Sequence, residues 1–358
     1  MLHAEEPSTE FTPDEYPPFP DDASFPTFDL ETIDLKRLVQ HDEAEQRRVF
    51  EACKTRGFFY LDLAGCESGE AILHGADNIC RVAERFFALP VDEKSKYKIL
   101  PGCLDGYKCV GATRTDKSGT PDTAEFFNIA KNDFILPEGA KMSRDWPELI
   151  VREQPLFNTY MRAAHSTGML IMDILMQNLG IAPEELRSRH RLEKPAGDII
   201  RLTRGPPRKD AAMPEVQTPS HTDFGTITVL MNWLGGLQIS SASARTAGDH
   251  EPDISGKWLW VKPKKGCAII NLGDASVKFT NGALCSGRHR VLPAPGEQGK
   301  WPRYSIVYFV RPENDCILQR LDGEGVPPLR DGEEDEAVTA KDWIVRQASK
   351  LGQQFTDN

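Results

Sequence analysis

The sequence predicts a protein of the α+β or mainly-β class, built on an antiparallel β-barrel or sandwich that helices flank. From Asp198 onward, short runs rich in β-branched and aromatic residues alternate with turn residues, which is the pattern of antiparallel strands. Upstream of these runs, apolar residues recur at helical spacing over 154–179 and predict one long helix against which a sheet can pack. Of the 358 residues, 39% are hydrophobic, which is enough for a large core.

The amino-terminal half is expected to begin with a strand, a helix and a second strand. An extended segment at 28–30 precedes apolar residues at helical spacing over 35–56, and the apolar run 57–61 follows. A second helix over 70–87 ends before a proline, because proline cannot continue a helix. Residues 102–122 hold four glycines and a proline, which predicts a loop that lines a site.

Seven strands are expected in the carboxyl-terminal half, each a β-like run bounded by turn residues. They span 199–202, 226–234, 237–239, 258–261, 267–272, 289–292 and 304–310. Between the third and the fourth, the stretch 240–257 is rich in Ser, Ala, Gly and Asp and predicts an exposed loop. The chain returns to helix over 340–350, where Thr339 is a candidate N-cap.

Composition divides the chain into five regions. Residues 1–26 combine six prolines with acidic side chains and predict a loose arm that buries little surface. The other regions are the N-terminal region 27–135, the helical support 136–197, the barrel core 198–315 and a carboxyl-terminal segment with a helix, 316–358. Residues 27–350 are expected to form one structural unit, because a barrel with attached helices accommodates this length.

The charge and the cysteine content argue against several classes of protein. The net charge of -11, from 54 acidic and 43 basic residues, argues against a nucleic-acid partner. No apolar run approaches the roughly 18 residues of a membrane span, and the amino terminus lacks the basic and apolar regions of a signal peptide. The eight cysteines are irregularly spaced without a C-x-x-C pair, which predicts free thiols in a reducing, cytoplasmic setting.

Three His-x-Asp/Glu patterns occur in the chain, and only one lies in strand context. His3 falls in the proline-rich arm, and His41 in a helical stretch where residues two apart point to different sides. His221 and Asp223 precede a β-branched strand, and residues i and i+2 of an extended chain share a face. His289 begins another expected strand and supplies a third ligand. Two imidazoles and one carboxylate on one face of a metal are typical of non-haem iron(II) sites.

An arginine and a serine downstream of the last histidine predict a carboxylate-binding pair. On a strand Arg303 and Ser305 share a face, while Tyr304 turns away. The planar guanidinium can donate two parallel hydrogen bonds to a carboxylate, and the hydroxyl a third. The pair therefore predicts an anchor for a dicarboxylate.

With these motifs in place, the chain resembles the isopenicillin-N-synthase-like branch of the iron(II)/2-oxoglutarate-dependent dioxygenases over most of residues 26–350. The segments that carry the resemblance are A-C-x-x-x-G-F-F at 52–59, F-F-x-L-P-x-x-E-K at 86–94, and the stretch 271–291 that brings in the second histidine. The resemblance implies a double-stranded β-helix core of the jelly-roll, cupin-like kind, flanked by helices.

The resemblance also implies an oxidoreductase with Fe(II) as cofactor and with 2-oxoglutarate and O2 as co-substrates. His221, Asp223 and His289 would bind the iron, with no catalytic side chain beyond the metal centre. Arg303 and Ser305 would hold the distal carboxylate of 2-oxoglutarate. The substrate would be a small organic molecule of specialised metabolism, which the enzyme hydroxylates, desaturates or rearranges; an oligomeric state is not specified.

The chain departs from this family where many relatives read N-x-Y-P. It reads Thr203-Arg204-Gly205-Pro206, so the tyrosine hydroxyl is missing and Thr203 is expected to supply its hydrogen bond to the co-substrate. Two alternatives stay open: an iron-dependent oxidase that does not use 2-oxoglutarate, and a non-catalytic barrel that binds a metabolite. The side chains expected to line the substrate pocket are Tyr107, Phe126, Phe127, Met231 and Phe279.

Overall fold

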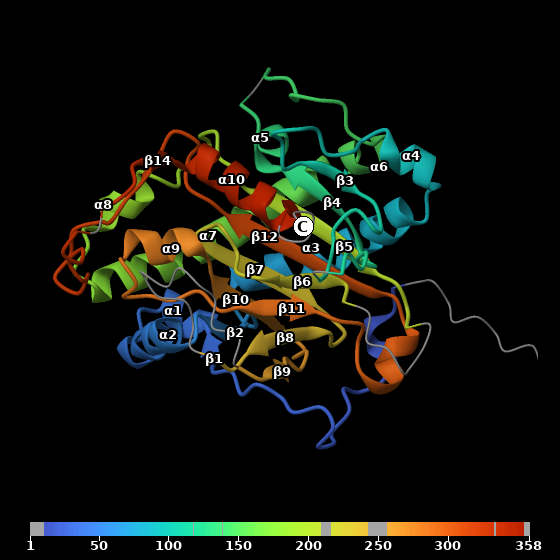
Figure 1. The fold of residues 1–358 in the computed structure, drawn as a ribbon, viewed down its shortest axis with the longest axis horizontal. Coiled ribbons are helices and arrows are strands. Elements are labelled where there is room, and N and C mark those ends of the chain that lie inside the picture. Colours follow the sequence, from blue (N-terminus) through green and yellow to red (C-terminus); the bar gives the residue numbers. More distant parts are fainter. Residues whose placement is uncertain are drawn as a thin grey trace, which may run out of the picture.

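Two β-sheets form the centre of the protein, and helices cover the outer face of the larger sheet (Figure 1). The computed structural model describes residues 11–116, 118–137, 139–208, 216–242, 256–332 and 334–353. The larger sheet has eight strands in the order β1-β2-β10-β7-β12-β5-β4-β3, and the smaller has four in the order β6-β11-β8-β9. A separate two-stranded sheet joins β13 and β14.

Neighbouring strands of the two main sheets run antiparallel, except for the parallel pair of β1 and β2. The larger sheet contains β1 (Thr32–Asp34), β2 (Phe58–Asp62), β10 (Cys267–Leu272), β7 (Ile227–Asn232), β12 (Arg303–Val310), β5 (Ile199–Gly205), β4 (Glu125–Ala130) and β3 (Gly106–Lys108). The smaller sheets contain β6 (Thr218–His221), β11 (His289–Val291), β8 (Leu237–Ser240), β9 (Trp258–Trp260), β13 (Ile317–Leu318) and β14 (Val338–Thr339). Each of the seven expected strands of the carboxyl-terminal half is confirmed within a few residues.

Two long helices, α3 and α7, provide most of the cover on the larger sheet. The helices are α1 (Leu35–Val39), α2 (Glu43–Thr55), α3 (Glu67–Phe87), α4 (Val91–Ser95), α5 (Lys131–Phe134), α6 (Glu148–Val151), α7 (Gln154–Asn178), α8 (Pro183–Arg187), α9 (Asp274–Phe279) and α10 (Ala340–Gln353), with short 3-10 turns η1 (Pro13–Glu15) and η2 (Gly296–Lys300). Helix α7 approaches the sheet closely at Gly168, where an added Cβ would meet the side chains of Ile227 and Val310 at 3.1 and 3.2 Å. The absence of a side chain there sets the distance between helix and sheet.

Strand β12 shows how the sequence pattern places the two faces of the larger sheet. Arg303 and Ser305 point into a cavity between the sheets, whereas Tyr304, Ile306 and Tyr308 pack into the core on the helical side. This alternation follows from the two-residue period of a strand. The strand therefore divides its side chains between core packing and the cavity.

Three expectations for the amino-terminal part are wrong in detail. The first strand is not at 28–30 but is β1, Thr32–Asp34. The single helix expected over 35–56 is two helices, because His41 adopts a left-handed conformation with φ 58° and Asp42 caps α2 by accepting hydrogen bonds from the backbone of Ala44 and Glu45. Of the arm 1–26, residues 1–10 lie outside the described residues, and the remainder packs against the molecule. Phe11 and Phe19 are buried, at 5% and 7% exposure.

The carboxyl-terminal helix α10 closes one side of the cavity between the sheets. Val345 and Ala348 contribute to the cavity lining, and the expected N-cap is confirmed, because the Thr339 hydroxyl accepts a hydrogen bond from the Asp342 backbone at 3.1 Å. Most of the expected exposed loop 240–257 lies outside the described residues. No helix among the described residues is long and apolar enough to cross a membrane.

Candidate active site

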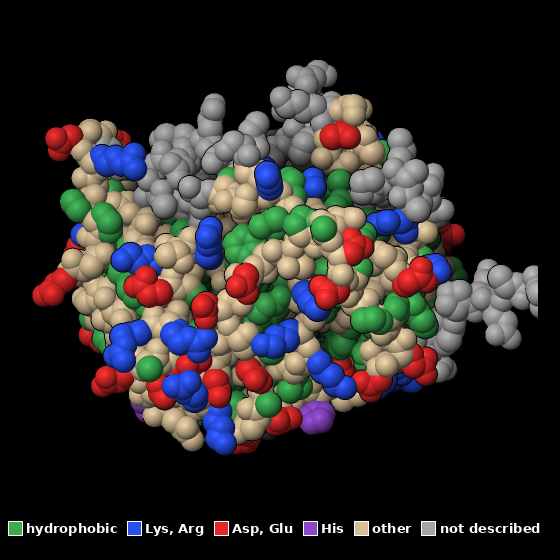
Figure 2. Space-filling model, turned by 90° about the horizontal axis from the view of Figure 1, so that it is seen from below, with side chains coloured by type: hydrophobic (Ala, Val, Ile, Leu, Met, Phe, Trp, Pro, Cys, Tyr) green, Lys and Arg blue, Asp and Glu red, His purple; other side chains and the backbone are tan. Residues whose placement is uncertain are grey.

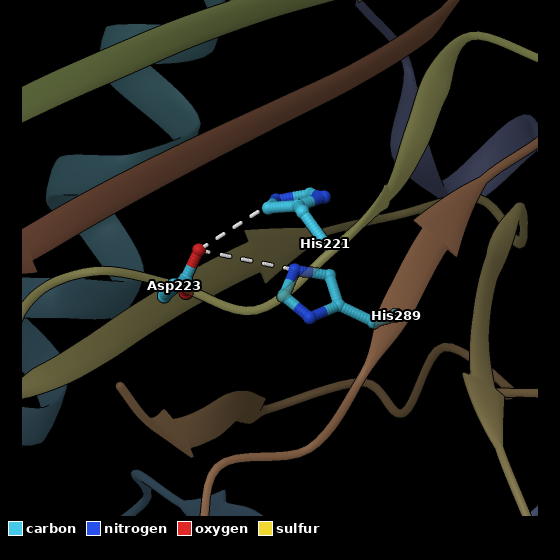
Figure 3. Close-up of side chains that lie close together, drawn as sticks. All are labelled: His221, Asp223 and His289. Atoms are coloured by element: carbon cyan, nitrogen blue, oxygen red, sulfur yellow. Dashed lines mark ion pairs between the residues drawn. The ribbon is translucent and has the colours of Figure 1, made fainter. Parts of the chain in front are cut away.

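Three side chains predicted to bind a metal lie close together (Figure 3), and all three line the cavity. His221 ends β6 and His289 begins β11, and the two residues are direct partners in the antiparallel pairing of these strands. Asp223 follows two residues after His221, in the turn before β7. His221 Nε2 and His289 Nε2 lie 3.7 and 3.9 Å from Asp223 Oδ1, and the three candidate ligand atoms lie within 4.8 Å of one another.

The hydrogen bonds around these side chains leave three lone pairs directed at the space between them. His221 Nδ1 and His289 Nδ1 donate to the backbone carbonyls of Pro219 and Gly287, at 2.8 and 3.2 Å. A carbonyl oxygen can only accept, so each Nδ1 carries a proton, and in the neutral form of each ring Nε2 is the acceptor. Asp223 Oδ2 accepts from both Thr228 and Asn271 at 2.7 Å, which leaves Oδ1 facing the imidazoles.

The protonation states also suit a divalent cation. Burial, together with the neighbouring His289 ring, lowers the pKa of His221 well below its usual value. Burial alone would raise the pKa of Asp223, but the two imidazoles and the hydrogen bonds from Asn271 and Thr228 outweigh it and lower that pKa. At neutral pH the site therefore offers a neutral imidazole and an ionised carboxylate, which are the forms that bind a metal.

The two residues predicted to anchor a carboxylate lie on the same wall of the cavity. Arg303 is only 2% exposed, and its Nε donates to the Gly235 carbonyl at 2.7 Å. One terminal nitrogen lies 3.5 Å from the Ser305 hydroxyl. Thr203 pairs directly with Ser305 across β5 and β12, and all three side chains line the cavity.

The cavity between the sheets has a volume of about 420 Å³. Residues of the 102–122 segment line it, as expected, but only one of the five predicted pocket side chains, Phe126, does so. The other four pack in the hydrophobic core instead: Tyr107, Phe127, Met231 and Phe279. Strand alternation explains the adjacent pair on β4, because Phe126 faces the cavity while Phe127 turns to the helical side and packs 4.4 Å from the Phe86 ring.

Comparison with known proteins identifies the family. Residues 26–149 match the family model of the non-haem dioxygenase N-terminal domain in morphine synthesis, and residues 196–312 match that of the 2OG-Fe(II) oxygenase superfamily. A 2-oxoglutarate-dependent dioxygenase of Aspergillus fumigatus is 33% identical over 339 residues, covering 90% of this chain and 85% of that protein. The chain belongs to the 2OG-Fe(II) oxygenase superfamily. The oxygenase uses Fe(II) and 2-oxoglutarate, and both alternatives left open by the sequence lose their support.

Other relatives agree with this assignment. A 2-oxoglutarate-dependent dioxygenase of Dothideomycetidae sp. is 30% identical over 328 residues, covering 90% of this chain and 89% of that protein. The fold of the oxygenase matches a full-length Neurospora crassa enzyme in complex with alpha-KG, with a TM-score of 0.71 and 21% identity over 89% of this chain and 96% of that one. It also matches JOX2 in complex with 2OG, Fe and JA, with a TM-score of 0.67 and 22% identity over 98% of this chain and 91% of that one.

The oxygenase has a residue near the expected co-substrate site that the sequence did not reveal, Gln217. A Cβ added at Gly205 would lie 2.2 Å from Oε1 of Gln217, so the carboxamide occupies the space that a side chain at position 205 would need. Gln217 is 2% exposed and lines the cavity with Arg303, the direct partner of Gly205 on β12. The only sequence signal was the glycine itself, which stands where many relatives have a tyrosine.

Proposed function

We propose that His221, Asp223 and His289 bind the ferrous iron of this oxygenase. The observation that supports this proposal is the convergence of two imidazole Nε2 atoms and one carboxylate oxygen, with no donor from the described residues bonded to them. Bound iron and 2-oxoglutarate together supply the activation of O2 that oxidises the substrate, with succinate and CO2 as co-products.

The proposed 2-oxoglutarate site consists of Arg303, Ser305 and Thr203. The buried guanidinium has one nitrogen committed to the Gly235 carbonyl, and its terminal nitrogens remain for a carboxylate. The adjacent hydroxyls of Ser305 and Thr203 supply further donors. These groups would orient the co-substrate so that its other end reaches the three ligands.

A small organic molecule of specialised metabolism is the proposed substrate. The cavity of about 420 Å³ supports this, as do the similar solved structures in complex with thymine and with JA. We do not expect a nucleic-acid or membrane partner: the net charge is -11, and acidic and basic side chains are interspersed on the face shown in Figure 2. The eight free cysteines support a reducing, cytoplasmic setting.

We further propose that residues 27–350 act as one unit. Strands β1 to β4 come from the N-terminal region, and they share one continuous sheet with β5, β7, β10 and β12 from the barrel core. A boundary between these regions would cut through hydrogen-bonded strand pairs, for example β4 and β5.

Turnover of 2-oxoglutarate tests the proposed function. With Fe(II), ascorbate and O2, the wild-type protein should form succinate from 2-oxoglutarate, and Asp223→Ala should abolish this formation because the carboxylate ligand is lost. Asp173→Ala is the matched control, since Asp173 on α7 pairs with Arg187 and is not part of the cavity lining. Succinate formation by Asp223→Ala at the wild-type rate would refute the ligand assignment.

A further inference from the structure

Arg201 presents an unpaired guanidinium to the cavity. Its side chain leaves β5 on the cavity side, and its Nε donates to Asn128 Oδ1 at 2.9 Å. The guanidinium carbon lies 4.1 Å from the centre of the Phe126 ring and 5.2 Å from that of Phe309. Among the described residues, no carboxylate lies within ion-pair distance of Arg201. The terminal nitrogens therefore have donors to offer a ligand.

The acidic side chains that line the cavity already have other partners. Among the residues that the structure describes, two carboxylates line it, Asp122 and Asp223. Asp122 forms an ion pair with Lys108, and Asp223 is one of the three proposed iron ligands. Neither forms an ion pair with Arg201, and a partly buried charge without such a partner is costly.

A second cation lies near Arg201, and the buried Asp198 carboxylate partly offsets its charge. Arg311 also lines the cavity, and its guanidinium carbon lies 5.1 Å from the same Phe309 ring that Arg201 approaches. Burial and the nearby Arg311 lower the pKa of Arg201 to about 10, so both arginines remain cations at neutral pH. Bound iron and 2-oxoglutarate do not neutralise Arg201. The two negative charges of 2-oxoglutarate balance only the positive charge of Arg303 and the single positive charge that Fe(II) keeps after pairing with the Asp223 carboxylate.

We propose that the substrate of this oxygenase carries a carboxylate and that Arg201 binds it. The inference rests on the proposed function, because it places this substrate beside the iron and 2-oxoglutarate. With Nε held by Asn128, the two terminal nitrogens form the planar fork that matches a carboxylate. The rings of Phe126 and Phe309 and the side chains of Ile199 and Val307 line the cavity nearby and would contact the apolar part of the molecule.

Binding of carboxylic acids and of their methyl esters to the loaded enzyme tests the proposal. The protein is loaded anaerobically with Fe(II) and 2-oxoglutarate, and octanoate and 3-phenylpropanoate are titrated by calorimetry against methyl octanoate and methyl 3-phenylpropanoate. At least one acid should bind about tenfold or more tightly than its ester, since the ester lacks the charge of the ion pair. Arg201→Met should abolish this preference. Arg201→Gln provides a second variant, in which the side chain stays polar but carries no charge.

Arg204→Met is the matched control. Arg204 lies on the same strand but outside the cavity lining, and it pairs with Glu125 at 3.1 Å. This variant should keep the preference for the acid, and Arg201→Met should keep the wild-type affinity for 2-oxoglutarate. Failure of both acids to bind, equal binding of acid and ester, or loss of 2-oxoglutarate binding in both Arg201 variants would overturn the proposal. A wild-type protein that does not bind Fe(II) and 2-oxoglutarate would instead refute the proposed function on which it rests.

Discussion

The hydroxyl of Thr228 is predicted to strengthen iron binding through the carboxylate that it supports. Thr228 and Asn271 each donate to Asp223 Oδ2 at 2.7 Å, and they help the two imidazoles to keep the carboxylate ionised, with Oδ1 facing the imidazoles. Thr228→Val keeps the shape of the side chain and removes one of the two donors. A hydrogen bond to a charged group contributes about 1.5–3 kcal/mol, so the dissociation constant for Fe(II) should rise about 10- to 100-fold.

Anaerobic equilibrium titration with Fe(II), repeated with Mn(II), measures this effect. Thr167→Val is the matched control, because Thr167 is 2% exposed on α7 and its hydroxyl has no hydrogen-bond partner in the described structure. The control should bind both metals like the wild-type protein, and circular dichroism should show that both variants fold. A dissociation constant for Thr228→Val within twofold of the wild-type value, or an equal change in Thr167→Val, would refute the role of this hydrogen bond.

Three further predictions concern the co-substrate site and the core. Arg303→Met should weaken 2-oxoglutarate binding by about 30-fold or more, since losing one partner of a buried charge pair costs 2 kcal/mol or more; calorimetry measures this. Gly205→Ala should lower the free energy of unfolding by about 1–3 kcal/mol, and this cost should shrink in a Gln217→Ala background, because the added Cβ collides with that carboxamide. His190 has its pKa lowered to about 4 by burial. Its unfolded form takes up a proton near pH 6.5 while the folded form stays neutral, so stability should fall by about 2 kcal/mol between pH 7 and pH 5 from this residue alone.

Each of these predictions has a control that distinguishes the specific effect from a nonspecific loss of folding or stability. For Arg303 the control is Arg204→Met, which should retain 2-oxoglutarate affinity. For Gly205, equal destabilisation in the wild-type and Gln217→Ala backgrounds would show that the collision is not its cause. For His190, the variant His190→Gln should lose less stability than the wild-type protein between pH 7 and pH 5; parallel pH profiles in denaturant unfolding would contradict the assignment.

Local patterns in the sequence were sufficient to predict the strands and the proximity of His221 and Asp223. The two-residue period of an extended chain predicted that His221 and Asp223 lie together, although β6 ends at His221 and Asp223 lies in the turn that follows. His289 needed the pairing of β6 and β11, which the sequence indicated only through the family resemblance. The cavity walls follow in the same way from strand parity, as at Arg303 and Ser305.

Features that depend on distant contacts could not be predicted. Phe126 and Phe127 are adjacent aromatic residues, and nothing in their own segment tells which of them faces the helices. Gln217 becomes significant only because β6 brings it against Gly205, and the break at His41 depends on a single left-handed residue. Arg201 resembled any strand arginine until the structure placed it in a cavity without a free carboxylate.

The most direct test of the ligand assignment is an anaerobic titration of the protein with Fe(II) and 2-oxoglutarate, followed by visible spectroscopy. The wild-type protein should develop the weak charge-transfer band of iron-bound 2-oxoglutarate. His221→Ala, Asp223→Ala and His289→Ala should each lose it, whereas His74→Ala, whose side chain is 79% exposed on α3, should retain it. A band of wild-type intensity in His289→Ala would contradict the proposed iron site.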